Sequence, residues 1–81
     1  QIYPNPTSDR ATWSFALPFA GRVVYQIQDL TGKVIEVKDL GVLTAGQNQI
    51  DLNTTQIPAG AYFITLQYQG LKTTQKLMIA K

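Results

Sequence analysis

The stretch that decides the fold of this chain is Arg22-Val23-Val24-Tyr25-Gln26-Ile27-Gln28-Asp29. Its apolar side chains recur at every second position, at Val23, Tyr25 and Ile27. The positions between them are Val24, Gln26 and Gln28. A period of two is typical of a β-strand with one buried face. We therefore predict a strand over residues 22–29, with Val23, Tyr25 and Ile27 pointing inward.

The same period continues on both sides of this stretch. We expect further strands over residues 11–17, 33–39, 47–52, 61–69 and 72–80. Residues 40–46 are expected to form a looser link, and residues 53–57 an irregular or 3₁₀ turn in which Ile57 plugs the edge of the fold. Helix is nearly excluded, because Gly or Pro interrupts nearly every window in which a helical period could begin.

Two turns separate the expected strands most clearly. Leu30-Thr31-Gly32 forms a tight turn, and we expect Gly32 to have positive φ. Pro58-Ala59-Gly60 forms the second turn. Tyr62 directly follows it near the start of a strand. This position can form a tyrosine corner, in which the phenol hydrogen-bonds to the backbone upstream.

Short strands at this spacing are typical of a β-sandwich. We therefore predict an all-β fold, an immunoglobulin-like antiparallel β-sandwich of about seven short strands, in which residues 1–81 form a single domain. The likeness to immunoglobulin domains is architectural only, because the chain has no cysteine. The expected core consists of the following residues: Trp13, Phe15, Tyr25, Ile27, Tyr62, Ile64, Leu66, Leu77 and Ile79.

The residue types needed for catalysis are nearly missing. The chain has no histidine and no cysteine, and neither Ser8 nor Ser14 has a base near it in the sequence. Asp51 and Asn53 offer two oxygen side chains, whereas calcium takes about six to eight oxygen ligands. We expect such side chains to cap turns instead. The chain is thus predicted not to be an enzyme, with no catalytic residue, no cofactor-binding residue, no cofactor and no metal site.

Charge and hydropathy exclude two further classes of partner. The formal net charge is only +2, and the lysines are spread along the chain, whereas a nucleic-acid interface gathers its cations on one face. No apolar run approaches the roughly 18 residues of a membrane helix. We therefore expect no nucleic-acid partner and no direct membrane insertion.

Exposed aromatic side chains and strand edges are the features through which the domain could bind a ligand or a partner protein. Phe63 lies opposite the Tyr62 face and Phe19 lies in a turn, so both are candidates for exposure. The uncharged strand at 61–69 could dock a partner if it formed a sheet edge, although we expect it to be a paired central strand. The alternative functions are therefore an accessory immunoglobulin-like adhesion or carbohydrate-binding module of a secreted protein, and a passive spacer.

Four short blocks carry a family resemblance. They are Tyr3-Pro4-Asn5-Pro6, then Asp29 with Gly32-Lys33, then Gly60-Ala61-Tyr62, and finally residues 76–81 with a lysine at each end. In this order they resemble the C-terminal sorting domain of cargo exported by the type IX secretion system of Bacteroidetes, also called the Por secretion system C-terminal domain. The resemblance covers essentially the whole chain. Gln28 departs from it, because many members have an aromatic residue before the aspartate.

The resemblance implies a non-catalytic C-terminal signal domain that directs attached cargo across the outer membrane. Its implied partners are the outer-membrane type IX translocon, a surface sortase-like protease that cleaves the domain off, and an upstream cargo domain in the same chain. The implied location is the periplasm in transit, then the cell surface or the extracellular space. On this reading the cargo and its inner-membrane signal lie ahead of Gln1.

The closing block is the expected contact with the translocon, because in the family this block is most closely tied to export. The expected recognition residues are Lys76, Leu77, Met78, Ile79, Ala80 and Lys81. A physical reason agrees with this choice. A chain-terminal strand at a sheet edge offers unpaired backbone donors and acceptors.

Overall fold

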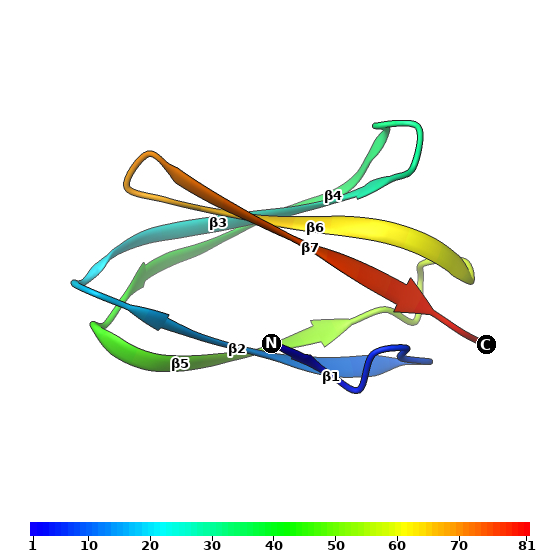
Figure 1. Ribbon diagram of the computed structural model, residues 1–81, viewed down its shortest axis with the longest axis horizontal. Coiled ribbons are helices and arrows are strands. Elements are labelled where there is room, and N and C mark those ends of the chain that lie inside the picture. Colours follow the sequence, from blue (N-terminus) through cyan, green and yellow to red (C-terminus); the bar gives the residue numbers. More distant parts are fainter.

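The computed structural model describes all residues 1–81 and contains seven strands and no helix. The strands are β1 (Ile2–Tyr3), β2 (Arg10–Leu17), β3 (Gly21–Asp29), β4 (Val34–Leu43), β5 (Gly46–Asn53), β6 (Gly60–Tyr68) and β7 (Leu71–Ile79). They form two antiparallel sheets with the orders β1-β2-β5 and β4-β3-β6-β7. The sheets face each other as two layers (Figure 1). The predicted immunoglobulin-like β-sandwich is confirmed.

The fourth strand distinguishes this sandwich from a constant-type immunoglobulin domain. In that type the fourth strand extends the sheet that contains the first strand. Here β4 pairs with β3 instead, so the second sheet has four strands and the first has three. The three-stranded sheet is also the one that contains the two-residue β1. The four-stranded sheet therefore extends beyond its cover along one side.

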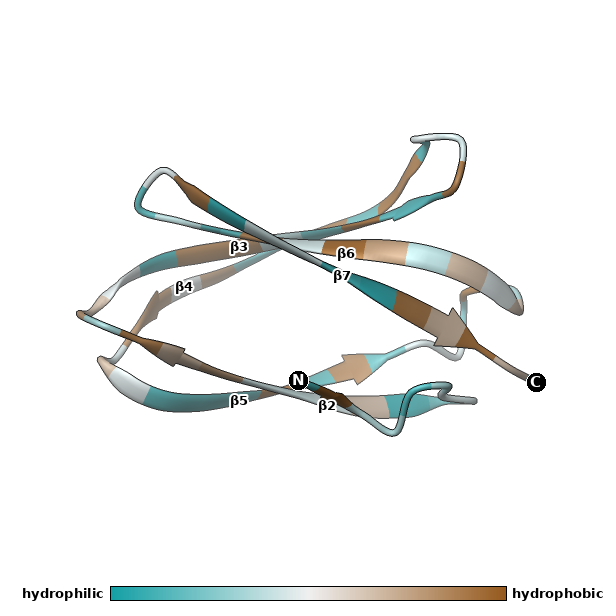
Figure 2. Ribbon diagram, viewed as in Figure 1, coloured by the Kyte–Doolittle hydropathy of each residue, from teal (hydrophilic) through white to brown (hydrophobic).

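The core has the faces that the alternation predicts. Val23, Tyr25 and Ile27 of β3 are buried, and β6 adds four buried side chains at alternate positions: Tyr62, Ile64, Leu66 and Tyr68. In Figure 2, β7 changes from hydrophilic (teal) to hydrophobic (brown) toward its C-terminal end, where Leu77 and Ile79 are buried. Phe15 alone departs from the predicted core. It is half-buried and packs edge-on against Trp13, with ring centroids 5.6 Å apart.

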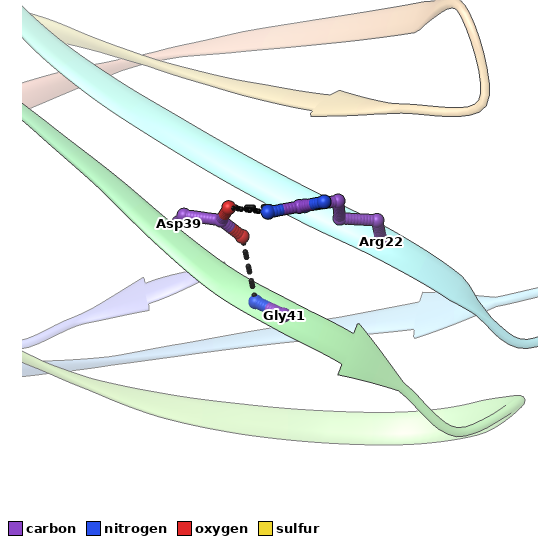
Figure 3. A network of polar contacts seen from close by, with 3 residues as sticks. All are labelled: Arg22, Asp39 and Gly41. Carbon is purple, nitrogen blue, oxygen red and sulfur yellow. Dashed lines mark hydrogen bonds and ion pairs between the residues drawn. The ribbon is translucent and has the colours of Figure 1, made fainter.

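The segment 40–46, expected as a looser link, is largely strand, so this prediction is wrong. β4 continues to Leu43, and its pairing with β3 shifts register between Val23 and Val24. The Asp39 carboxylate holds the irregular backbone. It accepts hydrogen bonds from Arg22 Nε at 2.9 Å and from the Gly41 N–H at 2.8 Å (Figure 3). A β-bulge adds one residue to a strand and so interrupts the period of two from which a strand is predicted.

The same carboxylate is electrostatically stabilised. The hydrogen bond from Arg22, followed by the Gly41 N–H, lowers the pKa of Asp39 below its ordinary value. Arg22 and Asp39 also form an ion pair on the protein surface. Both side chains are exposed, so the pair fixes the local backbone more than it adds to global stability.

Most of the predicted turns are confirmed. Gly32 has φ of +92°, as expected. Residues 53–57 form a turn in which the Ile57 N–H donates to the Thr54 carbonyl at 3.1 Å, and Ile57 is only 3% exposed.

No helix of the structure is long and apolar enough to cross a membrane.

The tyrosine corner is also present. The Tyr62 hydroxyl donates to the Pro58 carbonyl, four residues upstream, at 2.6 Å. The Tyr62 ring is buried at the start of β6, so the bond ties the preceding turn to the core. Tyrosine thus contributes both apolar area and a polar group at the sandwich edge.

Replacement of Tyr62 by phenylalanine should destabilise the domain by about 1 kcal/mol, because one partly buried hydrogen bond is lost while the ring stays. Urea unfolding measures the change. The matched control is Tyr3→Phe, at a side chain that is 73% exposed. Equal stability of the two variants would contradict a stabilising role for the corner.

Candidate functional site

The four blocks that carry the family resemblance gather at one end of the sandwich. Across the four-stranded sheet, Asp29 of β3 pairs with Tyr62 of β6, and Tyr62 pairs with Leu77 of β7. Two residues nearer the start of β6, Gly60 pairs with Ile79. The strands β6 and β7 begin and end, respectively, at this end of the molecule, close to the end of β1 (Figure 1). Segments far apart in the sequence therefore form one continuous region.

The opening block binds the closing block directly. Asn5 Nδ2 donates to the Lys76 carbonyl at 3.0 Å, and the Met78 N–H donates to Asn5 Oδ1 at 3.0 Å. One side-chain amide thus satisfies a donor and an acceptor on the outer edge of β7. Both peptide bonds that lead into Pro4 and Pro6 are cis.

Thr7 continues this contact through its backbone. The Thr7 N–H donates to the Met78 carbonyl at 2.9 Å, and the Ala80 N–H donates to the Thr7 carbonyl at 2.8 Å. This makes a parallel bridge between Thr7 and Ile79. The sequence did not predict that the opening block covers the end of the closing strand.

The covered part of the edge leaves a defined free part. Backbone groups alternate between the two sides of a strand, and those of Met78 face the opening block. The N–H and C=O groups of Lys72 and Thr74 therefore face the same outer edge, where β7 has no strand neighbour. The expectation of an open edge thus applies to the first half of β7. Its last residues are already paired.

The side chains of the closing block divide into two groups. Leu77 and Ile79 are buried, at 0% and 3% exposure, and anchor β7 in the core. The exposed members of the block are Lys76, Met78, Ala80 and Lys81. Lys81 Nζ also donates to the Thr55 carbonyl at 2.9 Å, which holds the chain end against the turn after β5. Only the exposed group can touch a partner while the domain is folded.

The middle block is a turn held by one carboxylate. Asp29 Oδ1 accepts hydrogen bonds from the Thr31 N–H at 2.9 Å, from the Thr31 hydroxyl at 2.6 Å and from the Lys33 N–H at 3.0 Å. The Thr31 hydroxyl, followed by the two backbone N–H groups, lowers the pKa of Asp29 below its ordinary value. The positive φ of Gly32 completes the turn. The aspartate, the glycine and the lysine backbone thus act as one structural unit.

Among the remaining polar candidates, Asn53 has a structural role. Asn53 Oδ1 accepts hydrogen bonds from the Thr55 N–H at 3.1 Å and from the Thr55 hydroxyl at 2.7 Å, as the turn-capping interpretation predicts. No group of three or more Asp or Glu side chains lies together in a way that could hold a metal ion.

The aromatic candidates for ligand binding are dispersed. Phe19 is exposed but its ring packs on Tyr68, with centroids 5.5 Å apart. Phe63 is half-buried on the outer face of β6. β6 lies between β3 and β7, so the prediction of a paired central strand is confirmed. Phe63 lies opposite Lys76 of the closing block, whereas Phe19 packs on Tyr68 at the other end of β6, so the two rings do not form a common platform.

Comparison with known proteins identifies the region. The model of the family described as "Secretion system C-terminal sorting domain" matches residues 1–80. No curated protein matches the chain. The family match covers the first three blocks in full and the fourth as far as Ala80.

Asn5→Ala should lower the stability of the domain by about 1 to 2 kcal/mol, because two hydrogen bonds to the edge of β7 are lost. The amide of Met78 should also exchange with solvent faster, as NMR can measure. Gln67→Ala, at an exposed position on the neighbouring strand, is the control. Unchanged exchange at Met78 would contradict the proposed contact.

Thr31→Val should raise the pKa of Asp29 toward its ordinary value, because the largest cause of its depression is the Thr31 hydroxyl. A depressed carboxyl pKa stabilises the fold at pH above the unfolded-state pKa of about 3.9. That stability is lost as the pH falls through the lower folded-state pKa. The Asp29 carboxyl pKa can be followed by NMR titration, and acid unfolding should depend less on pH in the variant. The same Asp29 pKa in both proteins would contradict the assignment.

Proposed function

The chain belongs to the family of type IX secretion system C-terminal sorting domains, and we propose that it is a non-catalytic signal domain that directs an attached cargo across the outer membrane. Proteins that carry this signal are secreted and reach the cell surface or the extracellular space. The observation that carries the proposal is the assembly of all four family blocks into one region at one end of the sandwich. We propose that residues 1–81 form this signal as a single domain.

Recognition by the translocon is proposed to use the closing strand. Its exposed members, Lys76, Met78, Ala80 and Lys81, supply the contacts. Leu77 and Ile79 act indirectly, because they hold the strand in place from within the core. The free backbone groups of Lys72 and Thr74 give the same edge a capacity for strand addition.

The proposed route has three steps. The domain folds in the periplasm, is bound by the outer-membrane translocon, and is then cleaved off at the cell surface by a sortase-like protease. None of these steps requires catalysis by the chain itself. This accords with the structural roles of its polar side chains, since Asp29 and Asn53 cap turns and Asp39 holds the bulge of β4.

An export assay tests the proposal. Residues 1–81 are fused behind a fluorescent protein with an inner-membrane signal and expressed in a Bacteroidetes host, with and without a working translocon. Fluorescence at the surface or in the medium should require both the domain and the translocon. Periplasmic retention of a folded, stable fusion would overturn the proposal and favour the adhesion or carbohydrate-binding module.

Within this assay, Lys76→Glu should reduce export at least several-fold, because it reverses a charge on the proposed contact surface. The matched control is Lys38→Glu, which makes the same change on β4, at the opposite edge of the same sheet. Both lysines are exposed, so neither change should unfold the domain. Equal export of the two variants would place recognition away from the closing strand. Truncation from Gln75 onward should abolish export, but it also removes two core residues and is therefore the weaker test.

A further inference from the structure

The edge of β2 is covered along only part of its length. β1 pairs with β2 at Ile2↔Trp13 and Tyr3↔Thr12. The ladder then continues for one more residue, since the Ser14 N–H donates to the Gln1 carbonyl at 2.8 Å and the Gln1 amino group donates to the Ser14 carbonyl at 2.8 Å. Beyond that point β2 runs on past the N-terminus without a neighbour on this edge (Figure 1).

The facing part of β7 is uncovered as well. Leu71, Thr73 and Gln75 share the inner face of β7 with Leu77 and Ile79, because side chains alternate along a strand. Leu77 and Ile79 are buried, whereas Leu71 is 63% exposed. The inner face of β7 is thus buried where the opening segment lies against it and exposed where that segment is missing.

A cavity of about 170 Å³ lies between these two uncovered stretches. β2 lines it with Trp13, Phe15 and Leu17, and β7 lines it with Leu71, Thr73 and Gln75. Trp13 is 1% exposed, and its buried Nε1 has no hydrogen-bond partner. Buried polar groups without partners are uncommon in folded proteins. An apolar cavity of about 150 Å³ is large enough to hold a benzene-sized group. The cavity therefore has room for one large apolar side chain.

We propose that the residues immediately preceding Gln1 in the exported protein continue β1 along β2 and place an apolar side chain in this cavity. The inference rests on the proposed function, because it requires cargo joined ahead of Gln1. The register of the existing ladder fixes the positions. The residue directly before Gln1 lies opposite Phe15 and shares its inward face. The residue before that one lies opposite Ala16.

The backbone of β2 is ready for this pairing. The N–H and C=O groups of Ala16 face the same edge as those of Ser14, by the alternation of an antiparallel ladder. Two more paired residues would therefore cover β2 as far as Ala16. Continuity with a ladder already formed favours this occupant over a separate strand.

Hydrogen exchange in the cargo-linked protein tests the inference. Mass spectrometry compares the linker before Gln1 and the Ala16 amide in the parent and in Thr73→Phe, which fills the cavity from the β7 side. In the parent, exchange at both places should be slower by at least about tenfold than in an unstructured linker. Thr73→Phe should abolish this protection. Lys72→Phe, on the opposite face of the same strand, should leave it intact.

Each other outcome overturns the inference. If the linker amides exchange freely in the parent, the linker does not occupy the cavity. If their protection from exchange survives in Thr73→Phe, the linker is bound at another place. Protection that depends on protein concentration assigns the site to a strand from a second copy. The export assay, run on the same proteins, shows whether only the linker inference fails or the proposed sorting function fails as well. Export that needs the domain while the linker is unprotected leaves the sorting function standing.

Discussion

The hydrogen-bonded contact between the Asn5–Thr7 segment and the end of β7 is the interaction on which the rest of the arrangement depends. β1 belongs to the three-stranded sheet and β7 to the four-stranded sheet, so this contact joins the two layers as well as the two ends of the chain. A chain of 81 residues without cysteine buries a modest core and has no disulfide to hold its edges. Hydrogen bonds between backbone segments at the open side of the sandwich hold part of these edges together.

The residues of the four blocks therefore have structural roles, because their side chains form hydrogen bonds with backbone groups. Asn5 completes the edge of β7, Asp29 holds a turn through three donors, and Tyr62 ties the turn before β6 to the core. None of these residues has the surroundings of a catalytic group. Under the proposed function, the translocon would recognise the outer edge of β7, and the hydrogen bonds of Asn5 hold the end of that edge in one arrangement.

Local sequence patterns were sufficient for most of the strands, although not for β1 or the end of β4, and insufficient for the contacts between distant segments. The period of two placed Val23, Tyr25 and Ile27 correctly, and the glycine of the Leu30-Thr31-Gly32 turn predicted its positive φ. The continuation of β4 was missed, because the bulge held by Asp39 depends on Arg22 in the neighbouring strand. The contact of Asn5 with β7 was missed because it joins residues more than 70 positions apart. Such contacts follow from topology, which a period along one strand does not contain.

The two uncovered edges lie on the same side of the sandwich, and this has a consequence for export. The free half of β7 and the free half of β2 line one cavity, and the N-terminus lies beside it. The point at which cargo would be joined is thus next to the strand proposed to contact the translocon. An open edge at this place is also a hazard, because unpaired strands attract other chains. A linker laid along β2 would cover that edge while leaving the outer edge of β7 open, so attachment and recognition would use neighbouring strands without competing for the same backbone groups.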